Sequence, residues 1–506
     1  MSPAQRLHAI APMEAAETPL NFERGNLDPA NWSATRAQAH TMLDDMLDYI
    51  QHIRSRPVWQ PIPSSARARF HASLPDAPQN LADIHDEFMR FILPYAAGNV
   101  HPGFMGWVHG GGTVEGMLAE MLAAGLNANL GGRDHMPIEV ERQVLHWVRE
   151  LFGFPDSASG LFVTGTSMAN LLSVLVARHA RLGQAVRRKG VGVGLRGYAA
   201  VTAHRCIGQA FDLSGLGTNA LGLVPVDGNF RMDIAELSRA IRRDRDAGMT
   251  PFMVVGTAGT VDTGAIDDLA ALAALAKREG LWFHVDGAFG ALAMLSDRIA
   301  PRLKGIEAAD SIAFDFHKWG QVPYDAGFLL VRDGKAHKDT FANPAAYLRR
   351  EVRGLAGGEH WPCDFGPDLS RGFRALKTWF TIKAHGRARL GEMIERSCEL
   401  AQRLEARILA EPRLELLART ELNIVCFRYR ATDEINAAIV GDLQESGIAA
   451  PSTTTIGGKL AIRAALVNHR TEMRDLAAML TAVLEFGNKR EQKLRAIPCQ
   501  APCQQT

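Results

Sequence analysis

The chain has few cysteines, almost no net charge and no long apolar run. Its six cysteines among 506 residues are too sparse for a disulfide framework. The 56 basic and 55 acidic residues leave a formal charge of +1, so electrostatic binding to nucleic acid or anionic lipid is not expected. No run of about 18 apolar residues could span a membrane, and residues 1–20 lack a basic segment followed by an apolar one. These absences predict a cytoplasmic protein with a small-molecule partner.

Metal-binding patterns are also missing. Cys499 and Cys503 are the closely spaced cysteines, and no second cysteine or histidine pair stands at ligand spacing. We therefore predict no metal site, and we assign both cysteines to a flexible tail over residues 490–506.

The length and composition predict more than one lobe. A chain of 506 residues exceeds the roughly 250–300 residues at which one hydrophobic core stops growing. The 47% of hydrophobic and 22% of charged residues are typical of a globular protein. We predict three parts ahead of the tail: an N-terminal helical dimerisation segment at 1–100, a large domain at 101–384 and a small C-terminal α+β domain at 385–489.

An amphipathic helix is predicted near the N-terminus. It starts at Ser33 and ends before Pro57, and its apolar residues recur at helical spacing: Met42, Leu43, Met46, Leu47, Ile50 and Ile53. Irregular, proline-rich sequence follows. The apolar stripe must therefore dock on something larger, and a partner subunit would serve.

Short apolar runs alternate with helical stretches from about residue 160. Strands are expected at 161–164, 199–203, 252–255, 281–285 and 311–314. This alternation predicts an α/β fold with a mostly parallel sheet covered on both faces. One intervening helix, 269–276, has Asp267 and Asp268 at its start and Gly280 beyond its end. After about residue 384, helices alternate with two strands, which predicts the α+β domain.

Two sequence patterns that often mark active sites lie in a sequence context that does not fit those sites. Gly192, Gly194 and Gly197 have dinucleotide-loop spacing, but they precede a predicted strand instead of following one. The His109–Gly112 run resembles an esterase oxyanion loop, but the chain lacks the nucleophile elbow that accompanies it. A dinucleotide site and a hydrolase are therefore not expected, and the absence of a Walker A sequence removes support for nucleotide hydrolysis.

Three segments place reactive side chains at the ends of predicted strands, where open α/β sheets form their sites. Gly165, Thr166 and Ser167 join a strand to a helix N-terminus and could cradle an anion or simply cap the helix. Asp286 ends an apolar strand and needs a cation unless it is a turn residue. Lys318 follows a strand between aromatic residues, which predicts a lowered pKa and a nucleophilic amine unless it reaches solvent. Together they are the parts that hold pyridoxal phosphate.

With those residues in view, the chain resembles the pyridoxal-phosphate-dependent group II amino acid decarboxylases of fold type I, which include aromatic-L-amino-acid decarboxylase. The similarity covers most of the chain and is most specific at HVDGA and DFHKW. Supporting segments occur in the family's order: HPGFMGWVHGGG, GLFVTGTSMANLL, TAHRCIGQA, GTAGTVDTGAID, NPAAYL and LSRGFRALKTWF.

The resemblance implies a role for each matched residue. Lys318 would be the Schiff-base lysine, Asp286 the partner of the ring nitrogen, and His204 and Ala288 the neighbours of the two ring faces. The phosphate would be held by Thr166, Ser167 and His317. Thr260 would also bind the cofactor, and Tyr347 would be the catalytic tyrosine of a mobile loop. The chain departs from the family at Val261 and Met168, where hydroxyl residues are common.

The same resemblance implies a cytoplasmic homodimer that decarboxylates an L-amino acid, and we expect an aromatic one. Trp107 lies in the segment expected to line the pocket, whereas Arg133 and His135 could pair with the distal carboxylate of an acidic substrate. Three alternatives use the same scaffold: decarboxylation of an acidic amino acid, decarboxylation with oxidative deamination to an aldehyde, and transamination. A non-catalytic binding protein is the alternative from another class.

Overall fold

A computed structural model describes residues 25–192, 194–343, 350–358 and 360–495. The larger of its two sheets has seven strands in the spatial order β2 (Ser159–Val163), β8 (Gly327–Val331), β7 (Ser311–Asp315), β6 (Trp282–Asp286), β5 (Thr250–Thr257), β3 (Leu195–Ala200) and β4 (Leu221–Val224). β8 runs antiparallel to both neighbours, and every other adjacent pair is parallel. The predicted α/β class with a mostly parallel sheet is confirmed.

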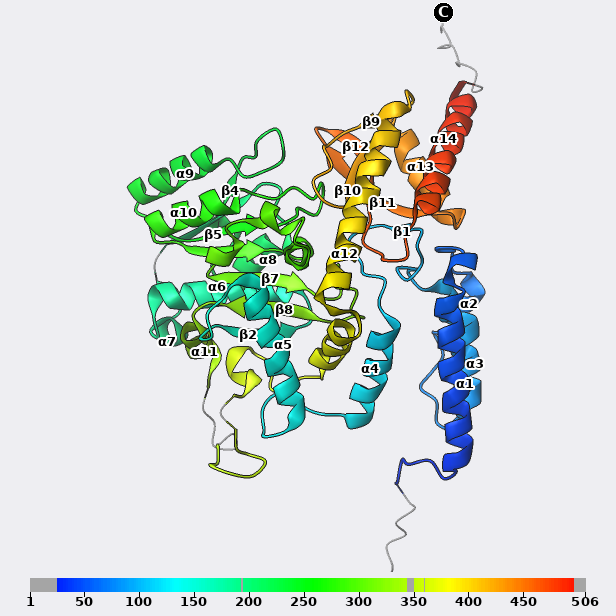
Figure 1. The fold of residues 1–506 in the computed structure, drawn as a ribbon, viewed down its shortest axis with the longest axis horizontal. Coiled ribbons are helices and arrows are strands. Elements are labelled where there is room, and N and C mark those ends of the chain that lie inside the picture. The colour runs from blue at the N-terminus through cyan, green and yellow to red at the C-terminus, as the bar shows by residue number, and fades with distance from the viewer. Residues whose placement is uncertain (1–24, 193, 344–349, 359, 496–506) are drawn as a thin grey trace, which may run out of the picture.

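Helices cover both faces of this sheet, which explains why its strands are apolar throughout (Figure 1). On one face, Ala313 and Leu329 pack against α6 (Thr166–Leu182). The alternate residues Phe314 and Leu330 belong to the core cluster on the other face. That cluster includes apolar side chains of α5 (Met136–Phe152), α9 (Ile234–Asp246) and α10 (Leu269–Glu279). Smaller helices α7 (Val186–Lys189), α8 (Cys206–Leu213) and α11 (Gly334–Phe341) complete this part.

The helix predicted at 269–276 is confirmed as α10. Asp268 caps it by accepting a hydrogen bond from the Ala271 amide at 2.9 Å, and Gly280 ends it with φ +65°. Asp267, which the sequence placed at the start of this helix, instead binds neighbouring segments. It is buried and accepts the amides of Met232 and Thr257 at 2.7 and 2.8 Å, and burial raises its pKa to about 6. It therefore links the segment at Met232 to the end of β5 at Thr257.

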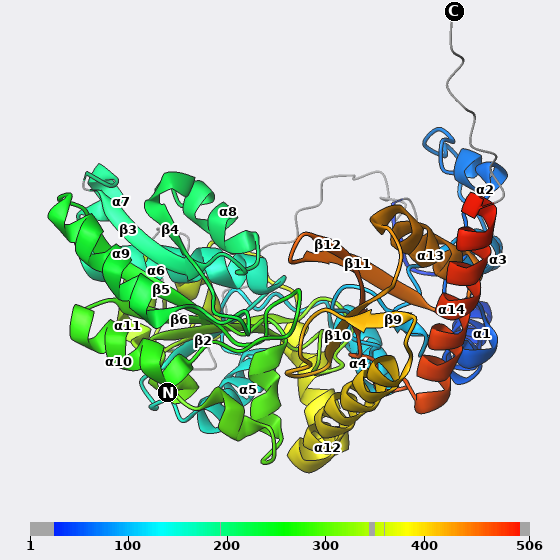
Figure 2. The same cartoon turned by 90° about the horizontal axis from the view of Figure 1, so that it is seen from above.

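The second sheet has five strands in the order β1 (Phe104–Met105), β11 (Ala450–Ile456), β12 (Lys459–Ala465), β10 (Ile424–Tyr429) and β9 (Leu414–Leu416). Its helices are α12 (Arg374–Ala410), α13 (Asp433–Glu445) and α14 (Met473–Arg495). Figure 2 shows this sheet beside the larger one. The structure bears out the predicted helices and the strands β10 and β12, whereas β1, β9 and β11 were not predicted. α14 also continues past residue 489 into the segment expected to be tail.

The N-terminal part consists of α1 (Trp32–Gln51), α2 (Ser64–Arg69) and α3 (Leu81–Phe91), followed by α4 (Val114–Leu126). α1 and α3 lie side by side at the edge of the molecule (Figure 1). The helix predicted from Ser33 is present, and the sequence expected to be irregular contains two further helices. No residue of α1 is fully buried, but its apolar stripe is partly covered within this chain: α3 packs beside it, and Ile53 just beyond its end is buried. No helix among the described residues is long and apolar enough to cross a membrane.

Candidate active site

A cavity of about 380 Å³ lies at the carboxyl ends of the strands of the larger sheet. The turn after β2 contributes Thr166 and Ser167, β6 contributes Asp286, and the turn after β7 contributes His317 and Lys318. His204 and Ala288 also line it. Seven of the nine predicted site residues therefore come together, because parallel strands end at the same edge of a sheet.

The N-terminus of α6 forms one end of this cavity. Gly165 is the N-cap, and Thr166 and Ser167 are the first helical residues, so their amides have no partner inside the helix. The Thr166 hydroxyl is buried and has no hydrogen-bond partner among the described residues. Free amides, an orphaned hydroxyl and the positive end of the helix dipole are the donors that a phosphate group requires.

Asp286 is nearly inaccessible, with 3% of its surface exposed. Burial raises its pKa, whereas the charges of Lys318 and His204 and a hydrogen bond from the Ala288 amide at 3.2 Å favour the ionised form. A carboxylate so placed gains strongly from a further cationic partner in the cavity, such as a protonated ring nitrogen.

Lys318 corrects one prediction. Burial alone would lower its pKa, as expected from the sequence, but the charge and hydrogen bond of Asp315, aided by Asp286, raise the pKa above its ordinary value. Lys318 Nζ lies 2.9 Å from Asp315 Oδ2. In the chain without a ligand the amine is thus held as an ammonium ion by a carboxylate three residues earlier.

The histidines at the site differ in accessibility. His317 is 5% exposed, and burial lowers its pKa to about 4, so it is neutral. Its Nδ1 accepts the Ala326 amide at 2.9 Å, which places the proton on Nε2, available to donate. His204 is exposed at the cavity wall, and its Nδ1 accepts the Cys206 amide at 3.3 Å. Its ring is therefore anchored at one edge and open to a ligand.

Two predicted residues are not brought to the cavity by the structure. Thr260 is buried, and its hydroxyl contacts that of Thr263 at 3.0 Å and accepts the Ala265 amide at 3.1 Å. It does not line the cavity, whereas the next residue, Val261, does. The contact expected between Thr260 and a cofactor is therefore not supported, because the hydroxyl serves its own turn. Tyr347 lies outside the described residues.

Sequence reasoning missed Asp315 and Tyr324, which both line the cavity. Asp315 ends β7 and is 1% exposed, so the rule that singled out Asp286 could have found it. Tyr324 comes from the loop between β7 and β8, and burial raises its pKa. Because Tyr324 lies in a loop, no helical or strand periodicity in the sequence could have identified it as a site residue.

Neighbouring segments hold the Lys318 turn in place. Gly110 of the HGGG run lies against it: its amide donates to the His317 carbonyl at 3.3 Å, and a side chain there would meet the Lys318 carbonyl at 2.4 Å. Gln321 Oε1 accepts the Gly111 amide at 3.0 Å, and Gln321 Nε2 donates to the Val467 carbonyl at 2.8 Å. The glycine run thus permits close packing and does not bind an oxyanion.

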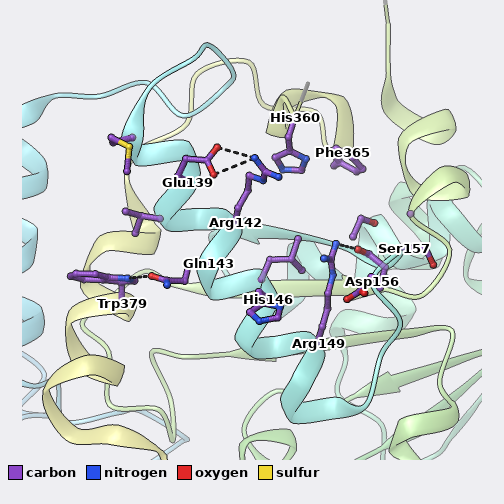
Figure 3. A pocket seen from close by; sticks show the side chains of 16 residues that line it. Glu139, Arg142, Gln143, His146, Arg149, Asp156, Ser157, His360, Phe365 and Trp379 are labelled. Carbon is purple, nitrogen blue, oxygen red and sulfur yellow. Dashed lines mark hydrogen bonds and ion pairs between the residues drawn. The ribbon is translucent and has the colours of Figure 1, made fainter. Parts of the chain in front are cut away.

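A second, larger depression of about 830 Å³ lies on the outer face of α5 (Figure 3). Arg142 forms an ion pair with Glu139 at 2.9 Å, and Gln143 accepts a hydrogen bond from the Trp379 indole at 2.7 Å. Burial lowers the pKa of His360 to about 4, so it is uncharged. Arg142 and Glu139 are also more than half exposed, whereas Arg149 Nε is buried without a hydrogen-bond partner among the described residues.

The fold and the Lys318 cavity define a pyridoxal-phosphate enzyme of fold type I. The orphaned Thr166 hydroxyl, the free α6 amides and the buried Asp286 fit the phosphate and the ring nitrogen of that cofactor. Residues 63–430 match the family described as pyridoxal-dependent decarboxylase conserved domain, and the chain belongs to this family of amino acid decarboxylases.

Individual relatives agree with this family. The chain is 32% identical over 479 residues to an aromatic-L-amino-acid decarboxylase of Bacillus atrophaeus, covering 92% of this chain and 97% of that protein. Its fold matches Oryza sativa TDC with PLP and tryptamine with a TM-score of 0.85 and 25% identity, over 92% and 100% of the two chains. It also matches Rhodiola rosea 4-hydroxyphenylacetaldehyde synthase with a TM-score of 0.81 and 25% identity, over 91% and 99%.

Proposed function

We propose that this decarboxylase converts an aromatic L-amino acid to its amine and CO₂. The observation that carries the substrate class is the aromatic wall of the cavity. Trp107, His109 and Tyr324 line it, with Trp107 and His109 stacked at 5.9 Å and His109 edge-on to Tyr324 at 5.8 Å. Such a wall offers planar contact to an aromatic side chain. The Bacillus relative and the rice enzyme have names that point to the same class.

The groups considered for an acidic substrate lie elsewhere. Neither Arg133 nor His135 lines the cavity, and the Arg133 guanidinium stacks over Trp361 at 4.7 Å. Within this chain, no distal carboxylate in the cavity would meet that arginine. This favours the aromatic class over the acidic one.

We assign the following roles. Lys318 bonds to the cofactor, Asp286 keeps the ring nitrogen protonated, and His204 and Ala288 contact the two ring faces. Thr166, Ser167 and the Nε2–H of His317 donate to the phosphate. When bound, the cofactor supplies an electron sink for the electron pair left behind by CO₂. Clamping the ring between His204 and Ala288 fixes the plane to which the scissile bond must stand perpendicular.

Proton delivery to the former α-carbon decides between amine and aldehyde. We assign it to Tyr347, following the NPAAYL match, with Tyr324 as a competing donor on the cavity wall. The aldehyde alternative is retained because the fold also matches an enzyme named as an aldehyde synthase. Transamination needs the proton at the cofactor carbon instead, and nothing in the cavity favours it.

We further propose a homodimer with the division into parts predicted above. Apolar side chains of α1 are only partly buried in this chain, and α4 exposes Met121, Leu122 and Leu126 at 55%, 46% and 63%. A second copy could cover both surfaces. The cytoplasmic location stays a prediction from the sparse cysteines.

A panel of amino acids tests the proposed reaction. Purified enzyme loaded with pyridoxal phosphate is given phenylalanine, tyrosine, tryptophan, histidine, glutamate and aspartate, and CO₂, amine, aldehyde and peroxide are measured. We expect CO₂ and amine in equal amounts from an aromatic substrate. If glutamate or aspartate is consumed at least about tenfold more efficiently, or if aldehyde and peroxide are the main products, the proposal is wrong.

A further inference from the structure

The anion cradle contains a buried carboxylate as well as donors. Asp315 is 1% exposed, and its Oδ2 pairs with Lys318 Nζ at 2.9 Å. Its other oxygen, Oδ1, is buried and has no hydrogen-bond partner among the described residues. That oxygen lies 3.8 Å from the point where a Cβ on Gly165 would stand, so it is beside the first residue of the cradle.

The charged groups around Asp315 do not offset a further anion. On its own turn are Lys318, an ammonium ion, and His317, which is neutral and has Nε2 3.7 Å from Asp315 Oδ2. The N-terminus of α6 offers hydroxyls and amides and no cationic side chain. Tyr324 faces Asp315 from the loop before β8 and stays protonated.

Other ionisable neighbours act on Lys318 and His317. Asp286 favours the charged form of Lys318, and burial raises the pKa of the Cys206 thiol to about 12, so the thiol is neutral and adds no charge. Asp325 and Lys377 act on His317 with opposite signs. His204 is the exposed histidine of the cavity wall. Lys318 is therefore the cation that balances Asp315.

A phosphate dianion entering this cradle would meet the Asp315 carboxylate at close range. Two anions that share a buried site cannot both stay fully ionised, because each raises the pKa of the other. Lys318 cannot offset both, because bonding to the cofactor aldehyde releases water and leaves its nitrogen with one N–H donor where the ammonium had three. One proton must therefore be gained when the phosphate binds.

We propose that the cofactor phosphate binds together with one proton, held between Asp315 Oδ1 and a phosphate oxygen. Before binding, Asp315 Oδ2 pairs with Lys318 Nζ at 2.9 Å; after binding, the proton taken up lets the carboxyl group donate to the phosphate or share that proton with it. Cofactor affinity consequently falls as pH rises. This inference rests on the proposed function of the Lys318 cavity as the cofactor site.

The test is the pH dependence of the dissociation constant for pyridoxal phosphate. Full-length protein freed of cofactor is titrated between about pH 7 and 8.5, where a free phosphate ester is mostly dianionic, and bound cofactor is measured by absorbance. Wild type and Asp315→Asn are compared. One linked proton makes the wild-type dissociation constant rise about tenfold more per pH unit than that of the variant. Asp315→Asn should also bind the cofactor at least about tenfold more tightly at the upper end of this range.

Two controls identify the group responsible. Pyridoxal, which lacks the phosphate, should bind wild type and Asp315→Asn with parallel pH dependence. Asp310→Asn removes a half-buried carboxylate at the opposite end of β7, where it accepts the Phe283 amide at 2.7 Å, and should retain the wild-type slope. A misfolded Asp315→Asn would lose pyridoxal binding, and Asp315→Glu, which restores the acid, should then recover the wild-type slope.

Equal slopes for wild type and Asp315→Asn would overturn the inference. So would the same change in slope with pyridoxal, because Asp315 would then act through Lys318 and not through the phosphate. Failure of the proposed cofactor site looks different: wild type itself would show no absorbance at about 400–430 nm after cofactor addition.

Discussion

Two cavities of this protein contain charged side chains, and they satisfy those charges in different ways. In the α5 depression, Arg142 and Glu139 are paired and more than half exposed, as are His146 and Glu150 at 3.5 Å. In the smaller Lys318 cavity, Asp286 and Asp315 are at most 3% exposed, and Asp315 Oδ1 and the Thr166 hydroxyl have no hydrogen-bond partner within the part of the chain that the structure describes. Arg149 in the α5 depression also has a buried Nε without a partner among the described residues, so buried carboxylates distinguish the Lys318 cavity better than unmet polarity or volume does.

Removing the amine of Lys318 is the strongest test of this contrast. Lys318→Ala deletes the group that bonds to the cofactor, so turnover should fall by roughly 10⁴- to 10⁶-fold, the scale for loss of a catalytic nucleophile. The absorbance of the covalent complex should vanish as well. A link that borohydride still reduces in this variant would show that another amine bonds to the cofactor.

The proton donor gives the next largest effect. Tyr347→Phe removes one hydroxyl, so CO₂ release should survive while amine formation falls by about 10²- to 10⁴-fold. Tyr324→Phe is the matched change on the cavity wall and should leave the ratio of amine to CO₂ near one. If instead Tyr324→Phe loses amine formation and Tyr347→Phe keeps the ratio of amine to CO₂ near one, Tyr324 is the donor.

The aromatic wall should affect recognition more than chemistry. Trp107 is 57% exposed and stacks on His109, so Trp107→Ala should raise KM for aromatic substrates by about 10- to 100-fold while changing kcat little. Steady-state kinetics with tyrosine and with a small amino acid separate the two effects. An equal loss for both substrates would mean that Trp107 supports the fold and does not select the side chain.

The α5 depression should give the smallest effect. Arg142→Gln and His146→Gln remove exposed side chains that contact a glutamate on the same helix, and exposed ion pairs at this spacing contribute about 0.3–0.5 kcal/mol. We expect kcat and KM within about twofold of wild type, and little change in melting temperature. A tenfold loss of activity would remove the contrast between the cavities.

The sequence was sufficient for those parts of the site that follow from strand ends. Thr166, Asp286 and Lys318 are fixed by local pattern, since each follows a buried strand of one sheet. The direction of the Lys318 pKa was not predictable in this way, because it depends on which neighbour faces the amine. Thr260 was mistaken for a similar reason: the pattern places a hydroxyl near the site but does not say which way it points.

The fold shows the same limit. The sequence predicted β2, β3, β5, β6 and β7 of the larger sheet, because strands buried on both faces form continuous apolar runs, but it did not predict β4 or β8. β11 was missed because its central residues are threonines, of which Thr453 and Thr455 are exposed and Thr454 is partly buried, and β9 was missed because it has only three residues. Their assignment depends on pairing with β12 and β10, which lies beyond local sequence.

The hydrogen bonds of Gln321 have a consequence for synthesis on the ribosome. The turn that carries Lys318 is tied through this side chain to Gly111 and to the Val467 carbonyl, and His469 contacts the same amide oxygen at 3.0 Å. A nascent chain that has emerged only through the larger sheet lacks the last two of these ties. We therefore expect a chain that ends before residue 467 to hold the Lys318 turn less firmly and to bind the cofactor less tightly than the whole chain.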